Sequence, residues 1–248
     1  MQKDLSIVIP CYNENSRGNF QYRLDKLISF MCENTNIDFE IILVNDGSTD
    51  DTLKVIKYYE DNYEFVKVIT YKKNVGKSHA LKQGIKRAVG DYTLMMDADL
   101  NVPLKNINKF YNYISKATLH HLVIAVRTNK YENRSSARKF LSRMAHLSTS
   151  ILLGIPNIKD TQCGFKMFKT DKVVRILPCI RSKRWLFEIE LILYMQAQGI
   201  KVRTYDVKAR EDVPSTINSM EALKSSIKEL LMIVFTRRST IKQIQNTQ

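Results

Sequence analysis

The chain has 248 residues, 44% hydrophobic and 26% charged, so it can bury one sizeable core, and general disorder is excluded. Its 39 Lys and Arg residues against 25 Asp and Glu residues give a formal charge of +14, which favours nucleic acid, nucleotide phosphates or an anionic membrane leaflet as partners. Four scattered Cys residues argue against a disulfide framework, and the lack of a signal-peptide core or of about 18 consecutive apolar residues predicts a cytosolic protein, at most attached to a membrane face.

Short apolar segments alternate with helical patterns in the first half of the chain. Apolar spacing predicts helices around residues 24–31, 53–59 and 80–88. This alternation predicts an α/β fold with a mostly parallel sheet flanked by helices, whose ligands bind at the carboxyl ends of the strands. The predicted strands, each four or five residues long, are Leu5–Ile9, Glu40–Val44, Val66–Thr70, Tyr92–Met96 and Leu122–Val126.

The second half is dominated by helical patterns. A basic helix is expected over 134–153, a second helix over about 186–198 and a third over about 219–235. The last ten residues are polar, and we expect them to fray. We therefore expect one main domain over residues 1–212, followed over 213–248 by a C-terminal amphipathic helix and a polar tail.

Two polar loops follow the first two predicted strands. The first runs from Pro10 through Tyr12 to Glu14, and the second begins at Asn45 and Asp46. Asp46 is placed where its carboxylate can accept an N–H group of a base. The alternative is that the second loop is only a turn and a helix cap.

A third loop precedes the helix after the third strand. Lys77 lies in a Gly-Lys-Ser sequence, but the first glycine of a Walker loop is missing because position 71 is Tyr71. Lys77 can still meet a diphosphate, since the N–H groups of a helix N-terminus and an ammonium group both attract anions.

The fourth strand runs into Asp97, Ala98 and Asp99. Strand alternation predicts that the two carboxylates lie on one side. Two hard oxygen ligands at this spacing can hold Mg²⁺ or Mn²⁺ with positions left open for phosphate oxygens.

Taken together, these motifs resemble the family 2 glycosyltransferases, which have the GT-A fold. The resemblance spans about residues 5–212 and includes two further strings, 160–166 and 184–191. Both strings are similar to the branch of polyprenyl-phosphate sugar synthases that includes the dolichyl-phosphate β-glucosyltransferases.

The resemblance implies roles for individual residues on the donor side. Residues of the first two loops hold the nucleotide sugar, Lys77 lies near the nucleotide, and Asp97 and Asp99 bind its diphosphate through Mg²⁺ or Mn²⁺. The implied nucleotide-sugar-binding residues are Pro10, Tyr12, Glu14, Asp46, Lys77, Asp97 and Ala98.

On the acceptor side, Asp160 is expected to be a base or an acceptor-orienting carboxylate. A lipid monophosphate is already anionic at neutral pH. Its oxygen attacks the anomeric carbon with inversion, so the site needs cations that hold the phosphate more than it needs a general base. Arg127 is the first choice of cation. The expected acceptor-binding residues are Arg127, Arg134, Arg138, Gln162, Trp185 and Glu190, with the alternatives that Arg134 and Arg138 are solvated and that Glu190 braces Arg184 or the loop of Asp160.

The expected reaction is metal-dependent transfer of a hexose, most simply glucose, from a UDP-sugar to a polyprenyl phosphate. A prenyl acceptor requires docking on an anionic membrane surface, on its cytosolic face, through helix 134–153 or the segment 219–238, or through a membrane-anchoring protein. Core packing is the alternative for the segment 219–238.

Three other functions remain open. The donor can be GDP-mannose, and the acceptor can be a glycan or a protein. The charge also permits a nucleic-acid-binding protein, against which stand the single Trp and the lack of a known nucleic-acid motif.

Overall fold

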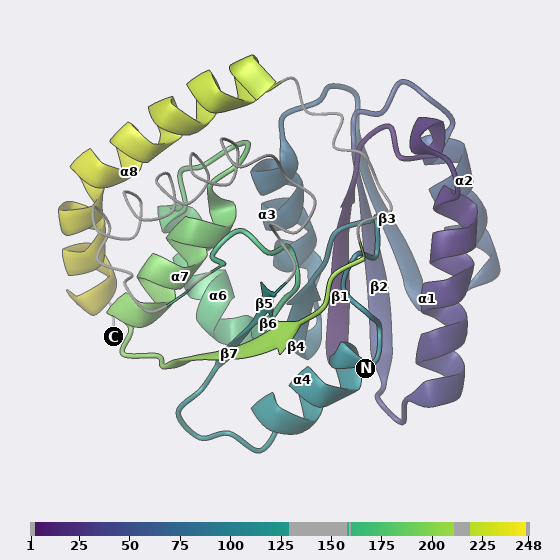
Figure 1. Ribbon diagram of the computed structural model, residues 1–248, viewed down its shortest axis with the longest axis horizontal. Helices are drawn as coiled ribbons and strands as arrows, with labels where there is room; N and C mark the ends of the chain where they lie inside the picture. Colours follow the sequence, from purple (N-terminus) through teal and green to yellow (C-terminus); the bar gives the residue numbers. More distant parts are fainter. Residues whose placement is uncertain (1–2, 129–157, 159, 211–218, 247–248) are drawn as a thin grey trace.

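A computed structural model describes residues 3–128, 158, 160–210 and 219–246 (Figure 1). Within these residues, strands form one sheet in the order β3-β2-β1-β4-β6-β5-β7. The strands are β1 (Lys3–Cys11), β2 (Phe39–Asp46), β3 (Val66–Tyr71), β4 (Gly90–Met95), β5 (Leu122–Arg127), β6 (Lys166–Lys169) and β7 (Val202–Val207).

The sheet is flanked by helices, as predicted. These are α1 (Phe20–Asn34), α2 (Thr52–Asn62), α3 (Lys77–Arg87), α4 (Asn106–Ile114), α6 (Thr170–Ile176), α7 (Phe187–Ala197) and α8 (Ser219–Asn246), with short 3-10 turns at Asn15–Arg17 and Leu177–Cys179.

The sheet is mostly parallel, which confirms the predicted fold class. β1 pairs in parallel with β2 and with β4, β2 with β3, and β5 with β7, whereas β6 runs antiparallel to both β4 and β5. All five predicted strands are present. β6 and β7 were missed because β6 has only four residues with Lys at both ends, and because β7 carries Arg203 and Asp206 among its apolar residues.

The two faces of the sheet support two apolar cores. In β1, Leu5, Ile7 and Ile9 pack toward α1, α2 and α4, whereas Val8 packs toward α3, α6 and α7. α7 is buried on all sides because it lies between the sheet and α8, which runs along its outer side (Figure 1). Each face of the sheet is therefore closed by helices, and the carboxyl ends of the parallel strands remain the edge available for ligands.

The predicted helices over 24–31, 53–59, 80–88 and 186–198 correspond to α1, α2, α3 and α7, whereas α4 and α6 were not predicted. The expectation of a frayed C-terminus was wrong, because α8 continues to Asn246 with Thr240 and Ile244 buried. The basic helix expected over 134–153 lies outside the described residues. No helix within the described ranges combines the length and the apolar character that crossing a bilayer requires.

Gly84 allows α3 to pack closely on the sheet, because a Cβ atom there would clash with Val8 Cγ1 and press on Val44 Cγ2. We predict that Gly84→Ala lowers the free energy of unfolding by about 1–3 kcal/mol, since overpacking outweighs the gain in helix propensity. Urea unfolding measures this change. Lys86→Ala, at an exposed position of the same helix, is the matched control, and equal stability of the two variants would contradict the close packing.

Candidate active site

Asp97 and Asp99 lie in a turn at the carboxyl end of β4. The strand ends at Met95, and Leu100 N–H donates to the Asp97 carbonyl at 3.3 Å. The two residues follow the strand and do not belong to it, so the prediction that strand alternation sets the direction of their side chains was wrong. The two carboxylates nonetheless interact: burial raises the pKa of Asp99, and the negative charge of Asp97 raises it further.

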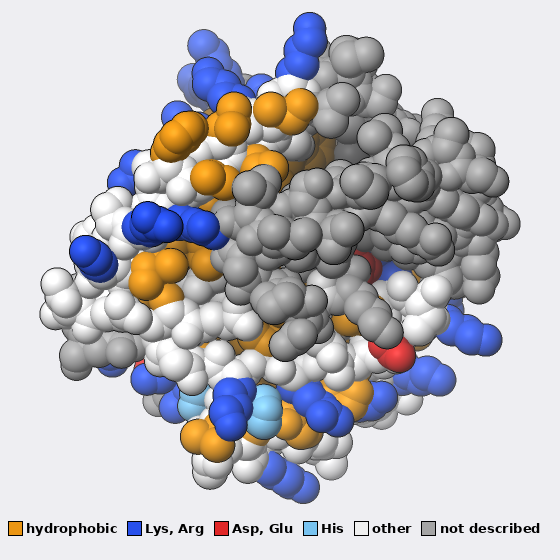
Figure 2. Space-filling view, turned by 60° about the vertical axis from the view of Figure 1, so that its left-hand side comes forward, with side chains coloured by type: hydrophobic (Ala, Val, Ile, Leu, Met, Phe, Trp, Pro, Cys, Tyr) orange, Lys and Arg blue, Asp and Glu red, His pale blue; other side chains and the backbone are white. Residues whose placement is uncertain are grey.

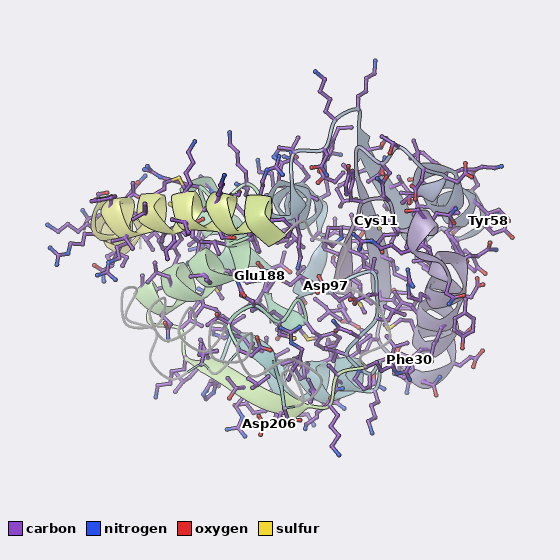
Figure 3. All side chains as sticks on the ribbon, turned by 45° about the horizontal axis from the view of Figure 1, so that its top comes forward. Cys11, Phe30, Tyr58, Asp97, Glu188 and Asp206 are labelled. Carbon is purple, nitrogen blue, oxygen red and sulfur yellow. The ribbon has the colours of Figure 1, made fainter. Side chains whose placement is uncertain are left out.

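Lys77, the first residue of α3, connects this turn to α7. Its Nζ atom lies 2.7 Å from Asp97 Oδ1 and 2.9 Å from Glu188 Oε1. Burial by itself lowers the pKa of Lys77, but the two carboxylates outweigh it and raise the pKa overall. Figure 3 shows Asp97 and Glu188 side by side near the centre of the molecule. Three elements distant in sequence thus contribute to one ionic cluster.

Glu188 is a site residue that the sequence analysis did not select. The string 184–191 contains both Glu188 and Glu190, of which only Glu190 is predicted as an acceptor-binding residue. Residues two apart on a helix point in nearly opposite directions, so only one of the two can face Lys77. The signal was therefore present in the motif, but the rotation of α7 decides between its two carboxylates.

Glu190 braces a loop instead. Its carboxylate is fully buried and accepts bonds from Arg181 N–H at 3.1 Å, Ser182 N–H at 2.7 Å and the Tyr194 hydroxyl at 3.2 Å. This agrees with the bracing alternative, although the braced loop is 181–186 rather than that of Asp160. Acceptor binding by Glu190 stays a prediction that this geometry does not favour.

Asp160 and Arg127 form a second ion pair. Arg127 Nε donates to Asp160 Oδ2 at 2.7 Å, and Nη2 donates to Oδ1 at 3.2 Å, with Asp160 1% exposed. Both carboxylate oxygens of Asp160 therefore accept hydrogen bonds from the guanidinium group. Of the two roles expected for Asp160, orientation fits this geometry better than proton removal.

Gly164, just before β6, and Lys166, the first residue of β6, lie beside the same cluster. Lys166 is fully buried, and its Nζ donates to the Cys163 carbonyl at 2.5 Å. Burial lowers the pKa of Lys166, and the negative charge of Glu188 opposes this shift. A Cβ atom at Gly164 would clash with the Asp97 carboxylate. Lys166 is a second residue not selected from the sequence, although it ends the recognised string 160–166.

Asp46 holds the loop that directly precedes Lys77. Its Oδ1 accepts Val75 N–H at 2.9 Å, and its Oδ2 accepts Asn74 Nδ2 at 2.8 Å and Gly76 N–H at 2.9 Å. The side chain is almost completely buried. Binding of a base by Asp46 stays a prediction, and the observed bonds already give it a role in shaping the edge.

Glu14 interacts electrostatically with Asp97 and Asp99. It is buried and forms ion pairs with Arg17 at 2.8 Å and Arg23 at 3.6 Å. Burial raises its pKa to about 7; the two guanidinium groups act against this shift, and the charges of Asp99 and Asp97 add to it. Glu14 is therefore close enough to sense the charge of the Asp97–Asp99 turn.

The remaining predicted residues are placed as follows. Tyr12 is exposed and available for stacking, Pro10 is half-buried, and Ala98 is buried in the turn. Gln162 is exposed, and Trp185 is half-buried, with an indole N–H that is buried and has no hydrogen-bond partner within the described part of the chain. The other two predicted acceptor-binding residues, Arg134 and Arg138, lie outside the described residues.

The donor set fits a divalent cation whose coordination is completed by other ligands. In the described ranges no three His, Cys, Asp or Glu side chains are grouped to hold a metal ion. Asp97 and Asp99 supply hard carboxylate oxygens, and Mg²⁺ or Mn²⁺ ordinarily takes its other ligands from water and phosphate. Burial raises the pKa of Asp99 and the negative charge of Asp97 adds to this shift, and a cation bound at the pair would offset both effects.

Lys77 balances the carboxylates on both sides of it. We predict that Lys77→Met lowers the free energy of unfolding at neutral pH by about 1–3 kcal/mol, because the partly buried carboxylates of Asp97 and Glu188 then lose their shared cation. Adding Glu188→Gln is expected to recover part of this loss, as measured by urea unfolding in a double-mutant cycle. Strictly additive losses from the two substitutions would contradict the shared ion cluster.

Glu14 makes stability depend on pH. Because its pKa is about 7 in the folded state against an ordinary 4.5, the folded protein binds this proton more tightly. The resulting stabilisation is present below the unfolded pKa and is lost as pH rises through the folded pKa. We predict that Glu14→Gln reduces the stability difference between about pH 5 and about pH 8 by about 1–3 kcal/mol.

Urea unfolding at the two pH values measures the effect of Glu14→Gln. Glu64→Gln, at an exposed position, is the control and is expected to leave the pH profile unchanged. A Glu14→Gln profile that matches the unmodified chain would contradict the raised pKa.

Comparison with known proteins relates this arrangement to a family. The model of "Glycosyl transferase family 2" matches residues 6–177. The dolichyl-phosphate beta-glucosyltransferase of Dictyostelium discoideum is 31% identical over 93% of this chain and 74% of its own length. The Saccharomyces cerevisiae protein of the same name is 32% identical over 90% of this chain and 69% of its own length.

Solved structures share the fold. Glucosyl-3-phosphoglycerate synthase from Mycobacterium tuberculosis, in complex with Mn²⁺, UDP-glucose and phosphoglyceric acid, has a TM-score of 0.70 at 16% identity, covering 94% of this chain and 80% of its own. This likeness confirms the expected GT-A fold. Because the family model matches more than half of the chain and the two relatives exceed 30% identity over most of it, this chain is a glycosyltransferase and belongs to glycosyl transferase family 2.

Proposed function

We propose that the chain transfers glucose from UDP-glucose to a polyprenyl phosphate, with inversion and with the help of a divalent cation, at the cytosolic face of a membrane. The observation that carries the proposal is the position of Lys77 Nζ, 2.7 Å from Asp97 at the strand ends. An ammonium group and a carboxylate pair at this edge suit a diphosphate and a cation. The names of the relatives, dolichyl-phosphate beta-glucosyltransferases, support glucose and a lipid phosphate.

The donor half combines charges from several elements. Asp97 and Asp99 would hold Mg²⁺ or Mn²⁺, which when bound neutralises negative charge on the departing nucleoside diphosphate. Lys77 adds a second positive charge to the same leaving group, and Glu188 keeps its ammonium group near the turn. The loops of Tyr12, Glu14 and Asp46 lie at the adjoining strand ends, where the nucleoside would bind.

The acceptor half follows from the chemistry of a phosphate monoester. Its second pKa is about 6, so its oxygen is anionic at neutral pH and attacks without a strong base. Arg127 is held in place by Asp160 through Nε and Nη2. A guanidinium group fixed this way can orient the phosphate against the repulsion of the donor's own phosphates. Attack from the face opposite the leaving group inverts the anomeric carbon.

A donor screen tests this function. Purified protein with Mn²⁺ and a short-chain prenyl phosphate is expected to transfer radiolabel from UDP-glucose and not from GDP-mannose. We predict that Asp99→Asn lowers the transfer rate by about 10²–10³-fold, because the cation loses a charged ligand. Asp61→Asn, an exposed change on α2, is the control.

Three results would contradict the proposal. Transfer from GDP-mannose alone would replace the donor, and transfer only to a glycan or a protein would replace the acceptor. A rate that chelation of divalent cations leaves unchanged would remove the role of the Asp97–Asp99 pair.

A further inference from the structure

α8 has two different faces. Its inner face packs on α7 through Ile233 and Ile244, both nearly or fully buried. The core-packing alternative for this segment is thus correct for one side of the helix. The other side carries a second apolar row at four-residue spacing: Ile227 is 50% exposed, Leu231 52% and Phe235 81%. Folding of the described residues leaves this row uncovered.

Basic side chains surround the apolar row. We call this side of α8 its outer face. It is formed by the exposed residues Lys224, Ile227, Lys228, Leu231, Phe235, Arg238 and Lys242. Apart from the adjacent pair Ile227 and Lys228, they recur at intervals of three or four residues, which places them on one side of an α-helix. Figure 2 shows hydrophobic side chains gathered on this side of the molecule with Lys and Arg side chains among and beside them.

The outer face carries no negative charge of its own. Among residues 224–246, α8 contains five Lys or Arg residues and a single acidic residue, Glu229. Glu229 belongs to the inner side, where its carboxylate is held by backbone N–H groups of the loop 182–186. Within residues 224–246, the exposed apolar row is flanked by cations, which is the pattern of a helix that lies in the plane of an anionic membrane surface.

We propose that the outer face of α8 docks on an anionic lipid bilayer. Ile227, Leu231 and Phe235 enter the boundary between headgroups and acyl chains, and the basic residues contact the headgroups. The proposal deepens the proposed function and rests on it, since an acceptor with a prenyl tail is reached at a bilayer. A second copy of this chain is a poorer occupant, because pairing two outer faces would bring their cations together.

Glu229 ties this face rigidly to the active site. Its carboxylate accepts bonds from the Ser182 hydroxyl at 2.7 Å and from four consecutive backbone N–H groups. These groups belong to Lys183, Arg184, Trp185 and Leu186.

The same loop reaches α3. The Arg184 carbonyl accepts Ser78 N–H at 3.3 Å, and the Lys183 carbonyl accepts His79 N–H at 3.1 Å, directly after Lys77. Docking through α8 therefore sets the orientation of Lys77 and Asp97 relative to the lipid surface.

Vesicle flotation tests the docking surface. At low ionic strength the full chain is expected to float with phosphatidylcholine vesicles containing about 30 mol% phosphatidylglycerol and not with phosphatidylcholine alone. The triple variant Ile227→Ser, Leu231→Ser, Phe235→Ser is expected to lose about ten-fold in bound fraction. Lys228→Glu with Arg238→Glu is expected to lose binding and its dependence on salt.

Matched controls come from the opposite side of the molecule. Tyr58 on α2 is 55% exposed and lies far from α8 (Figure 3), so Tyr58→Ser removes a comparable exposed ring. Lys54→Glu on the same helix controls for the change of charge. Both controls are expected to float like the unmodified chain. Thermal unfolding is expected to be unchanged in all these variants, because the substituted side chains are exposed.

The outcomes separate docking from catalysis. The α8 variants are expected to transfer sugar to a water-soluble short-chain acceptor at the unmodified rate, but more slowly to a long-chain acceptor in vesicles. A chain that stays unbound at low salt, or α8 variants that float normally, would overturn the docking proposal and leave the proposed function standing. A change in oligomeric state caused by the triple variant would overturn it in favour of a second copy. A chain that floats but transfers no sugar would overturn the proposed function alone.

Discussion

The ion cluster around Lys77 is the interaction on which the site depends. Its ammonium group contacts Asp97 from the turn after β4 and Glu188 from the first turn of α7. A partly buried cluster of opposite charges is stable only when each charge keeps its partners. The parallel pairing of β1 with β4, the N-terminus of α3 and the rotation of α7 must therefore all be correct before the cluster can form.

The cluster also explains why the site has two halves of different character. On one side, the negative charge of Asp97 acts on buried Asp99; on the other, Asp160 and Arg127 form a two-bond ion pair. Two residues relate the halves to each other. The ammonium group of buried Lys166 interacts with the charges of both Glu188 and Asp160, and Gly164 leaves room for the Asp97 carboxylate because it has no side chain. The proposed transfer between two phosphate-bearing substrates, which repel each other, needs a polar edge of this kind.

Support for this edge comes from carboxylates that bind the backbone of neighbouring loops. Asp46 holds the loop before α3, Glu190 holds the loop before α7, and Glu229 holds that same loop from α8. Each accepts several N–H groups, so the hydrogen-bonding capacity of a buried or half-buried carboxylate is satisfied within the protein. The outer helix α8 is thereby part of the body that positions the site.

By itself, the sequence determined the elements whose signal is local. Continuous apolar runs identified β1 to β5, periodic apolar residues identified α1, α2, α3 and α7, and motifs at their ends located Lys77, Asp97 and Asp99. Only the tertiary structure decided the rest. The four-residue strand β6 and the charge-bearing strand β7 are stabilised by pairing with neighbouring strands, so no local sequence pattern predicts them.

The same reason governs the side chains. Whether Glu188 or Glu190 faces Lys77, whether Asp160 is free or paired, and which side of α8 is covered all depend on how distant segments pack. Spacing along one segment carries no information about these non-local contacts.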